Sequence, residues 1–278
     1  MIQESDFQTA PDILYKYRRF DADGKHIRLI THRELWFASA KDFNDPFDTA
    51  FRYNLEGLEG ELGERWARVA TDRHLSHFGP EEREKYAATR LAKLREDPDE
   101  IQRMHQHTID SNYNKWGICS LCKSRDNLLL WAHYSEDHKG FCIGLSVEHL
   151  NSISRALVSQ KLLLDLHKVT YSPKVPNPNF FEKMLNLEDN SHITEFIATK
   201  SPDWGYEQEY RLVFWERANT ALQIPPEAIK EIILGCRISN ENRSLVLLAS
   251  RTHLPQAQLL QARKDVSTFA LVLEPLKD

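Results

Sequence analysis

The order of the predicted elements indicates an α+β protein. Short aromatic-rich segments, typical of strands, occupy both ends of the chain, and a charge-dense segment with apolar residues at helical spacing interrupts them. The segments do not alternate as β, α, β, α, which is the rhythm of a doubly wound parallel sheet. We therefore expect a single α+β domain over residues 1–278 with a helical insert or lid at residues 56–111.

The individual elements follow from alternation and from turn residues. Asn44, Asp45 and Pro46 end the second strand, because Asn and Asp bond their own backbone and Pro cannot continue a ladder. Strands are expected at residues 13–20, 35–39, 116–122, 140–145, 168–171, 206–215 and 229–236, and one or two within 258–275. Helices are expected at residues 128–134, 147–164, 180–199 and 240–252, and three within the insert, where Gly79-Pro80 and Asp97-Pro98 separate them.

Composition excludes several classes of protein. The 278 residues are 41% hydrophobic and 10% aromatic, enough for a core, so the chain is not disordered. The net charge of −5 excludes a global basic field for nucleic acid. No apolar run approaches the about 20 residues of a spanning helix, so no membrane partner is expected. Four cysteines and a polar N-terminus without the features of a secretory signal favour the reducing cytoplasm.

The segment from Tyr206 to Trp215 carries the strongest chemical signal. On a strand, Glu207, Glu209 and Arg211 share one face, and the two carboxylates lie about 7 Å apart. Like charges this close raise one pKa unless a cation intervenes, and Arg211 is that cation. An exposed strand with an ion pair is the alternative, but the flanking aromatic residues favour an embedded, functional strand.

Two further segments place polar residues beside apolar ones. Lys16 and Arg18 lie on one face of the first strand, which suits either a phosphate or carboxylate ligand or a cationic edge strand that avoids aggregation. His133 follows an apolar turn and could act as an acid, a base or a ribose contact, and Tyr134 could stack on a base. The alternative for His133 is a cap on a buried turn.

Metal and phosphate-loop patterns are absent from the sequence. Cys119 and Cys122 are half of a zinc pattern, but on a strand their thiols point to opposite faces, so no metal site is expected. Asp45 and Asp48 lack the spacing of a calcium loop and favour turn capping. Only 10 glycines are present and none forms a phosphate-binding loop, so a bound nucleotide must be held by strand side chains.

Several strings occur together in the order seen in a large bacterial family catalogued as a domain of unknown function, many members of which lie near phage-defence genes. The chain resembles this family over nearly its whole length. The strings are LYKYR at 14–18, LWFAS at 35–39, FNDPFD at 43–48, WAHY at 131–134, HKGF at 138–141 and YEQEYR at 206–211.

A more distant resemblance, to ADP-ribosyltransferases, implies a chemistry. It implies a strongly bent antiparallel or mixed β framework, with Lys16 or Arg18 on the pyrophosphate of NAD and Ser39 or Phe37 at the nicotinamide. Glu209 would be the catalytic carboxylate under a ribosyl cation. The complete expected sets are Glu209, Glu207 and His133 for catalysis, with Glu207 assisting the acceptor, and Tyr15, Lys16, Tyr17, Arg18, Ser39, Asn44, Tyr134 and Arg211 for NAD.

Three hypotheses follow. The first is a NAD-using ADP-ribosyltransferase or NAD-cleaving effector in bacterial anti-phage defence or a toxin–antitoxin pair, with a nucleic acid or a protein as acceptor. The second is a metal-dependent nuclease or phosphodiesterase in which His133, His138, Glu207, Glu209 and Asp45 converge. The third is a non-enzymatic sensor that docks a partner protein of a defence system through its insert. We favour the first.

Overall fold

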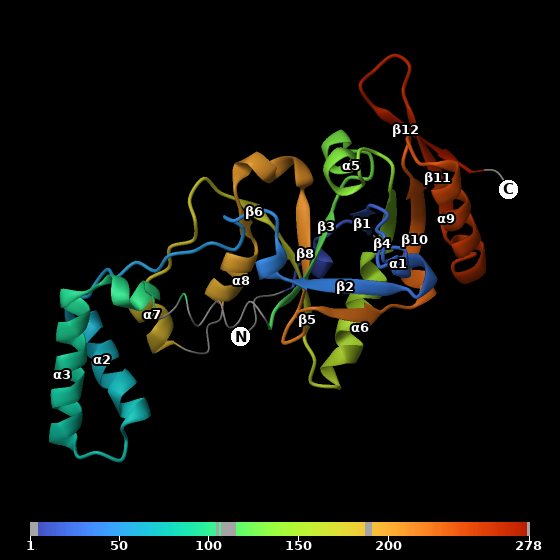
Figure 1. Ribbon diagram of the computed structural model, residues 1–278. Helices are drawn as coiled ribbons and strands as arrows, with labels where there is room; N and C mark the ends of the chain where they lie inside the picture. The colour runs from blue at the N-terminus through green and yellow to red at the C-terminus, as the bar shows by residue number, and fades with distance from the viewer. Residues whose placement is uncertain (1–4, 104–105, 107–114, 187–190, 277–278) are drawn as a thin grey trace. The chain divides into compact units, whose positions relative to one another are not determined.

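The computed structural model describes residues 5–103, 106, 115–186 and 191–276 (Figure 1). The chain divides into two compact units. Unit 1 comprises residues 1–4, 43–113 and 172–201, and unit 2 comprises residues 5–42, 114–171 and 202–278. No helix in the described ranges is long and apolar enough to cross a membrane.

Unit 1 is helical. Its elements are α2 (Glu61–His74), α3 (Pro80–Glu96), α7 (Phe180–Leu185), α8 (Ser191–Ile197) and the short strand β7 (Thr199–Lys200). α2 and α3 lie side by side (Figure 1), with Pro at the first position of α3 and Glu81 and Glu82 in its first turn, as the sequence predicts.

Aromatic side chains from distant parts of the sequence hold unit 1 together. Trp66 of α2 packs against Phe180 of α7, with ring centroids 5.2 Å apart, and Phe51 stacks on Phe196 of α8 at 3.9 Å. Aromatic pairs of this kind stabilise by about 0.5–1.5 kcal/mol beyond the area that they bury. Unit 1 is therefore larger than the insert predicted at 56–111, because residues 172–201 complete its core.

Unit 2 is built on a mostly antiparallel sheet. The ten described strands are β1 (Ile13–Arg18), β2 (Glu34–Ser39), β3 (Gly117–Cys122), β4 (Phe141–Ser146), β5 (Leu164–Lys168), β8 (Glu209–Phe214), β9 (Thr220–Gln223), β10 (Ile229–Leu234), β11 (Gln258–Lys264) and β12 (Leu271–Pro275). Their order is β12-β11-β10-β4-β1-β3-β2-β9, and β8 pairs with both β3 and β5. Only β10 and β11 run parallel within this described sheet, so the predicted α+β class is confirmed.

The remaining elements of unit 2 connect these strands. They are α1 (Arg28–Thr31), α5 (Leu128–Tyr134), α6 (Val147–Val158), α9 (Asn240–His253), β6 (Thr170–Tyr171), and the short 3-10 helices η1 (Asp6–Gln8), η2 (Ala40–Asp42), η3 (Pro202–Glu207) and η4 (Pro226–Ala228). α6 begins at a capping side chain, since the Ser146 hydroxyl accepts from the amide of His149.

Four predicted elements differ from the structure. The predicted helix 147–164 ends at Val158, and the strand expected at 168–171 begins earlier, as β5 at Leu164. The strand predicted from Tyr206 begins only at Glu209, because Gln208 adopts a left-handed φ of 44° that interrupts extended backbone. The helix predicted at 180–199 is divided into α7 and α8, and its middle part, residues 187–190, lies outside the described residues.

Candidate functional site

Strand β3 lies at the centre of the site, and three strands, β8, β1 and β2, pair with its two edges. β8 pairs with β3 over its whole length, from Gly117 opposite Phe214 to Cys122 opposite Glu209. β1 pairs with β3 at Cys122, and β2 pairs with it at Ile118 and Gly117. Since β8 fills one edge, β1 and β2 share the other and diverge between those two ends. We call this divergence the β1/β2 split.

At the β1/β2 split, the side chain of Lys16 provides a hydrogen-bond donor for the backbone of β3. Its ammonium group donates to the main-chain carbonyl of Ser120 at 2.5 Å, at a position that β1 would otherwise have paired. The pKa of Lys16 falls from 10.5 to about 8, because burial, together with the charge of Arg18, outweighs the opposing effects of Cys119 and Glu209. Lys16 therefore makes a structural contact, and its expected contact with an anion stays a prediction.

The shifted pKa of Lys16 predicts a pH dependence of stability. Between the folded pKa of about 8 and the unfolded pKa of 10.5, the unfolded chain holds a proton at Lys16 that the folded chain lacks. The free energy of unfolding contributed by Lys16 therefore rises with pH across this window. Urea unfolding of wild type and Lys16→Met should show wild type gaining stability relative to the variant above about pH 8. A flat or falling difference would contradict this assignment.

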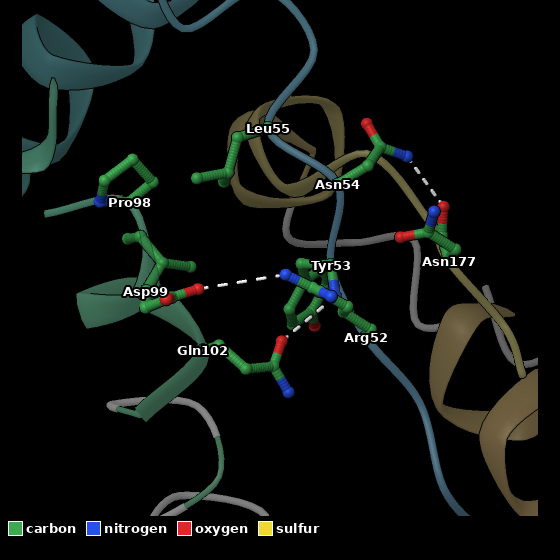
Figure 2. Close-up of a pocket in the computed structure, with 9 residues that line it drawn as sticks. Arg52, Tyr53, Asn54, Leu55, Pro98, Asp99, Gln102 and Asn177 are labelled. Carbon is green, nitrogen blue, oxygen red and sulfur yellow. Dashed lines mark hydrogen bonds and ion pairs between the residues drawn. The ribbon is translucent and has the colours of Figure 1, made fainter.

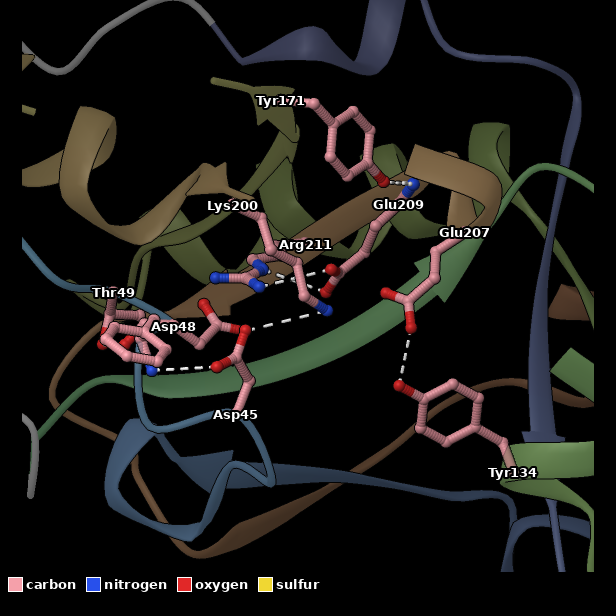
Figure 3. A network of polar contacts seen from close by, with 10 residues as sticks. Asp45, Asp48, Thr49, Tyr134, Tyr171, Lys200, Glu207, Glu209 and Arg211 are labelled. Atoms are coloured by element: carbon pink, nitrogen blue, oxygen red, sulfur yellow. Dashed lines mark hydrogen bonds and ion pairs between the residues drawn. The ribbon is translucent and has the colours of Figure 1, made fainter. Parts of the chain in front are cut away.

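Glu209 and Arg211 form a buried, bidentate ion pair at the start of β8 (Figure 3). The Arg211 Nε–Glu209 Oε1 distance is 2.9 Å and the Nη2–Oε2 distance is 3.2 Å. The side chain of Arg211 is 0% exposed and that of Glu209 is 3% exposed. The two residues share one face of β8, as the sequence predicts. Such a pair is stable only when its hydrogen-bonding groups are satisfied, and the fork geometry of arginine does this well.

Two tyrosines contact the backbone and side chains of the glutamates (Figure 3). The Tyr134 hydroxyl donates to Glu207 Oε1 at 2.6 Å, and the amide of Glu209 donates to the Tyr171 hydroxyl at 2.9 Å. Burial first, and then Glu207, raises the pKa of Tyr134, so this phenol stays protonated and donates. Glu207 itself is buried, at the end of η3 rather than on β8 as predicted.

A capping residue, Asn127, links α5, which carries Tyr134, to η3. Asn127 precedes α5, and its side-chain oxygen accepts from the amides of Leu129 and Leu130. Its Nδ2 donates to the carbonyl of Tyr206 at 2.9 Å. One asparagine thus begins the helix and ties it to the segment that carries Glu207.

The other first-strand candidates have different roles. The Tyr15 hydroxyl donates to Glu231 Oε2 at 3.2 Å, and the Tyr17 hydroxyl donates to the carbonyl of Ser124 at 3.0 Å, on the face of β1 opposite to Lys16. These are structural contacts. Arg18 is partly buried, which lowers its pKa, and no hydrogen bond or ion pair of its guanidinium occurs among the described residues.

Several predicted residues do not join this cluster. Ser39 lies opposite Gly117, five residues along β3 from the partner of Glu209, or about 17 Å at strand rise. Its hydroxyl accepts from the amide of Lys41. Phe37 is fully buried against Phe214, so it fills the core and does not line an open nicotinamide pocket. His133 is exposed on α5, with its ring 6.3 Å from that of Tyr206.

The FNDPFD segment belongs to unit 1. Asn44 is exposed there, and Asp45 Oδ1 accepts from the amide of Phe47 at 2.9 Å, which confirms its predicted turn-capping role. The side chain of Asp48 is 4% exposed and lies 3.8 Å from the ammonium of Lys200 (Figure 3), a partner that the sequence did not reveal.

Unit 1 also contains a pocket of about 380 Å³ (Figure 2). Arg52 and Asp99, which line it, form an exposed ion pair at 3.8 Å. The amide of Tyr53 donates to Gln102 Oε1 at 3.2 Å. The two charged side chains in its lining, Arg52 and Asp99, pair with each other, so the pocket shows no unmatched charge that would select a ligand.

The metal-dependent hypothesis needed five side chains to converge. No group of three or more His, Cys, Asp or Glu side chains is placed to hold a metal ion in the described part of the chain. Cys119 and Cys122 point to opposite faces of β3, as predicted, into different hydrophobic clusters.

One buried residue next to Arg211 was not predicted from the sequence. His167 lies directly opposite Arg211 in the pairing of β5 with β8 and is 2% exposed. Burial lowers its pKa, and its Nε2 has no hydrogen bond among the described residues. Leu164 and Leu166 alternate with polar residues, a pattern typical of a strand, and this pattern was the available signal. It was missed because a helix was predicted up to residue 164 and a strand only from residue 168.

The fold and this cluster define a mixed α+β protein with a buried carboxylate–arginine centre. Residues 130–212 match a family described as "Protein of unknown function (DUF2971)". The match runs from α5 into β8 and so contains Tyr134, Glu207, Glu209 and Arg211. No curated protein and no solved structure gives a significant match.

Proposed function

We propose that unit 2 is a NAD-using enzyme, an ADP-ribosyltransferase-like or NAD-cleaving effector with its catalytic carboxylate at Glu209. The observation that carries the proposal is the buried Glu209–Arg211 pair beside the β1/β2 split. Taking both charges out of water costs several kcal/mol per ion, a cost that folding alone does not require. Retention of such a costly group in the interior favours a chemical role.

The chemistry assigns one role to each group. The glycosidic bond between ribose C1′ and nicotinamide breaks, and nicotinamide leaves neutral with the bonding electrons. Glu209, ionised by its pairing with Arg211, stabilises the positive charge that develops on the ribose. An acceptor then adds to C1′ and gives up a proton, which Glu207, oriented by Tyr134, accepts. When water adds instead, the proton passes to bulk water.

Lys16 and Arg18 are the cations that this proposal places on the pyrophosphate. Arg18 supports this role because its partly buried guanidinium has no partner among the described residues. The acceptor is a nucleic acid or a protein, and the bacterial defence or toxin role implied by the family resemblance rests on the same activity. Four cysteines in the free thiol form support placing the protein in the cytoplasm.

Nicotinamide release tests the proposal. The full chain is incubated with NAD labelled in the nicotinamide ring, and separately with NAD labelled in the adenosine half, with RNA, DNA and protein offered as acceptors. We expect release of the first label, with transfer of the second to an acceptor or its appearance as free ADP-ribose. Absence of both nicotinamide release and NAD binding, the latter measured by calorimetry, would contradict the proposal.

A further inference from the structure

A second pocket, of about 610 Å³, lies within unit 2 at the β11–β12 hairpin. Leu128 at the start of α5, His138, the segment after β10 and the hairpin residues 264–271 line it. This volume suits a small organic ligand, for which pockets of roughly 300–1,000 Å³ are typical.

The pocket carries two exposed cations that form no ion pair with any described residue. Arg237 and Lys264 line it, and neither side chain makes a hydrogen bond or ion pair in the part of the chain that the structure describes. The acid in the lining, Asp265, keeps its negative charge, but its hydrogen bonds are made within its own turn. It accepts from the amides of Ser267 at 2.7 Å and Thr268 at 2.8 Å, and these bonds lower its pKa to about 2.

A strained turn places His138 in the same lining. Glu136, Asp137 and His138 have φ values of 52°, 54° and 68°, a run of left-handed residues without glycine. Each such residue costs on the order of 1 kcal/mol or more, and strain of this kind collects at functional sites. Backbone bonds hold the turn, since the amide of Arg237 donates to the His138 carbonyl at 3.0 Å.

The His138 imidazole has an unused nitrogen. Its Nδ1 is buried and has no hydrogen bond among the described residues, while its ring stacks on that of Trp131. Burial, followed by the charges of Arg237 and Lys264, lowers its pKa, whereas Asp137 raises it. A bound anion would supply negative charge beside Arg237 and Lys264.

The hairpin adds an apolar surface. Val266 and Phe269 are fully exposed at its tip, and both line the pocket. Isolated exposed apolar residues are common, but an aromatic ring on the rim of a cationic pocket suits a ligand with a planar base.

We propose that this pocket binds a nucleoside 5′-monophosphate, with the phosphate on Arg237, Lys264 and His138 and the base against Phe269. The cations Arg237 and Lys264, with the partly buried imidazole of His138 beside them, account for the phosphate, and the apolar hairpin tip accounts for the base. The site involves none of the residues assigned to NAD cleavage, so it stands or falls independently of that function.

Calorimetry with the full chain tests the proposal, using AMP, adenosine and inorganic phosphate as probes. We expect AMP to bind at least about tenfold more tightly than either fragment, because each fragment lacks one half of the contacts. Arg237→Gln and Lys264→Gln should each weaken AMP binding about tenfold, the loss of one charge-assisted hydrogen bond. Phe269→Ser should weaken binding of AMP and adenosine but not of phosphate.

Arg263→Gln is the matched control. Arg263 neighbours Lys264 on β11 but pairs with Glu274 on the other face, so AMP affinity should not change. Absence of AMP binding, equal affinity for adenosine, or equal loss in the Arg263 variant would overturn the proposal.

Cys236 provides a second, local readout. It lines the pocket and is partly exposed, whereas Cys119, Cys122 and Cys142 are buried. Saturating AMP should slow its alkylation at least about tenfold, as the ligand covers the thiol, and mass spectrometry would identify the modified cysteine. AMP binding without protection of Cys236 would place the ligand elsewhere and overturn the assignment.

Discussion

Replacing Arg211 by methionine is expected to lower the free energy of unfolding by about 3–5 kcal/mol, because it leaves the Glu209 carboxylate buried without its cation. Arg211 is 0% exposed and supplies both hydrogen bonds of the bidentate pair. The opposite face of β8 packs Tyr210, Leu212 and Phe214 into the core, so Glu209 has little freedom to turn toward water. Urea unfolding at neutral pH measures the change.

Two variants separate loss of the charge pair from loss of side-chain packing. The double variant Glu209→Gln/Arg211→Met should recover much of the lost stability, since no buried charge of the pair remains. Arg263→Met breaks an exposed ion pair with Glu274 and should cost only about 0–1 kcal/mol. A loss below about 1 kcal/mol for Arg211→Met would mean that the pair is solvated rather than buried.

Replacing Glu209 by glutamine is expected to reduce NAD cleavage about 100- to 1,000-fold, the loss typical when one preorganised electrostatic group is removed. The amide keeps the size of the side chain but cannot stabilise a ribosyl cation. Glu207→Gln should instead reduce transfer to an acceptor while sparing hydrolysis, because Glu207 is assigned to proton removal. Steady-state rates of nicotinamide release and of acceptor labelling distinguish the two.

A matched buried carboxylate controls for folding. Glu231 on β10 is 8% exposed and binds Arg125 at 2.8 Å and Tyr15 at 3.2 Å, so Glu231→Gln also disturbs a satisfied pair within unit 2. Its thermal unfolding should change, but its NAD cleavage should not. Equal losses of activity in the Glu209 and Glu231 variants would assign the effect to folding.

Local sequence patterns predicted most strands but missed the backbone irregularity at Gln208. Alternation and turn residues locate β1, β2, β3 and β4 to within a few residues, because one face of each is packed in a core. The left-handed Gln208 has no such signal, since a non-glycine residue adopts this conformation only where its surroundings hold it. The prediction that Glu207 and Glu209 lie on one strand was therefore wrong.

Long-range pairing was the other limit. Glu209 and Arg211 are two positions apart on one strand, and their pairing was predicted. Tyr171 accepts a hydrogen bond from the amide of Glu209, and His167 lies opposite Arg211 on β5. Spacing along the sequence does not encode either contact. The β1/β2 split depends on two strands sharing the edge of β3, and Ser39 consequently lies at its far end. The structure confirms the local contact between Glu209 and Arg211, whereas Ser39, whose position depends on the sheet order, lies far from that pair.

Nicotinamide release from NAD by the intact chain tests the central claim most directly. Wild type should release nicotinamide above the buffer rate, Glu231→Gln should retain that rate, and Glu209→Gln should fall to about one hundredth of it or less. Release at the buffer rate by wild type, or equal rates for wild type and Glu209→Gln, would contradict the assignment of Glu209 as the catalytic carboxylate.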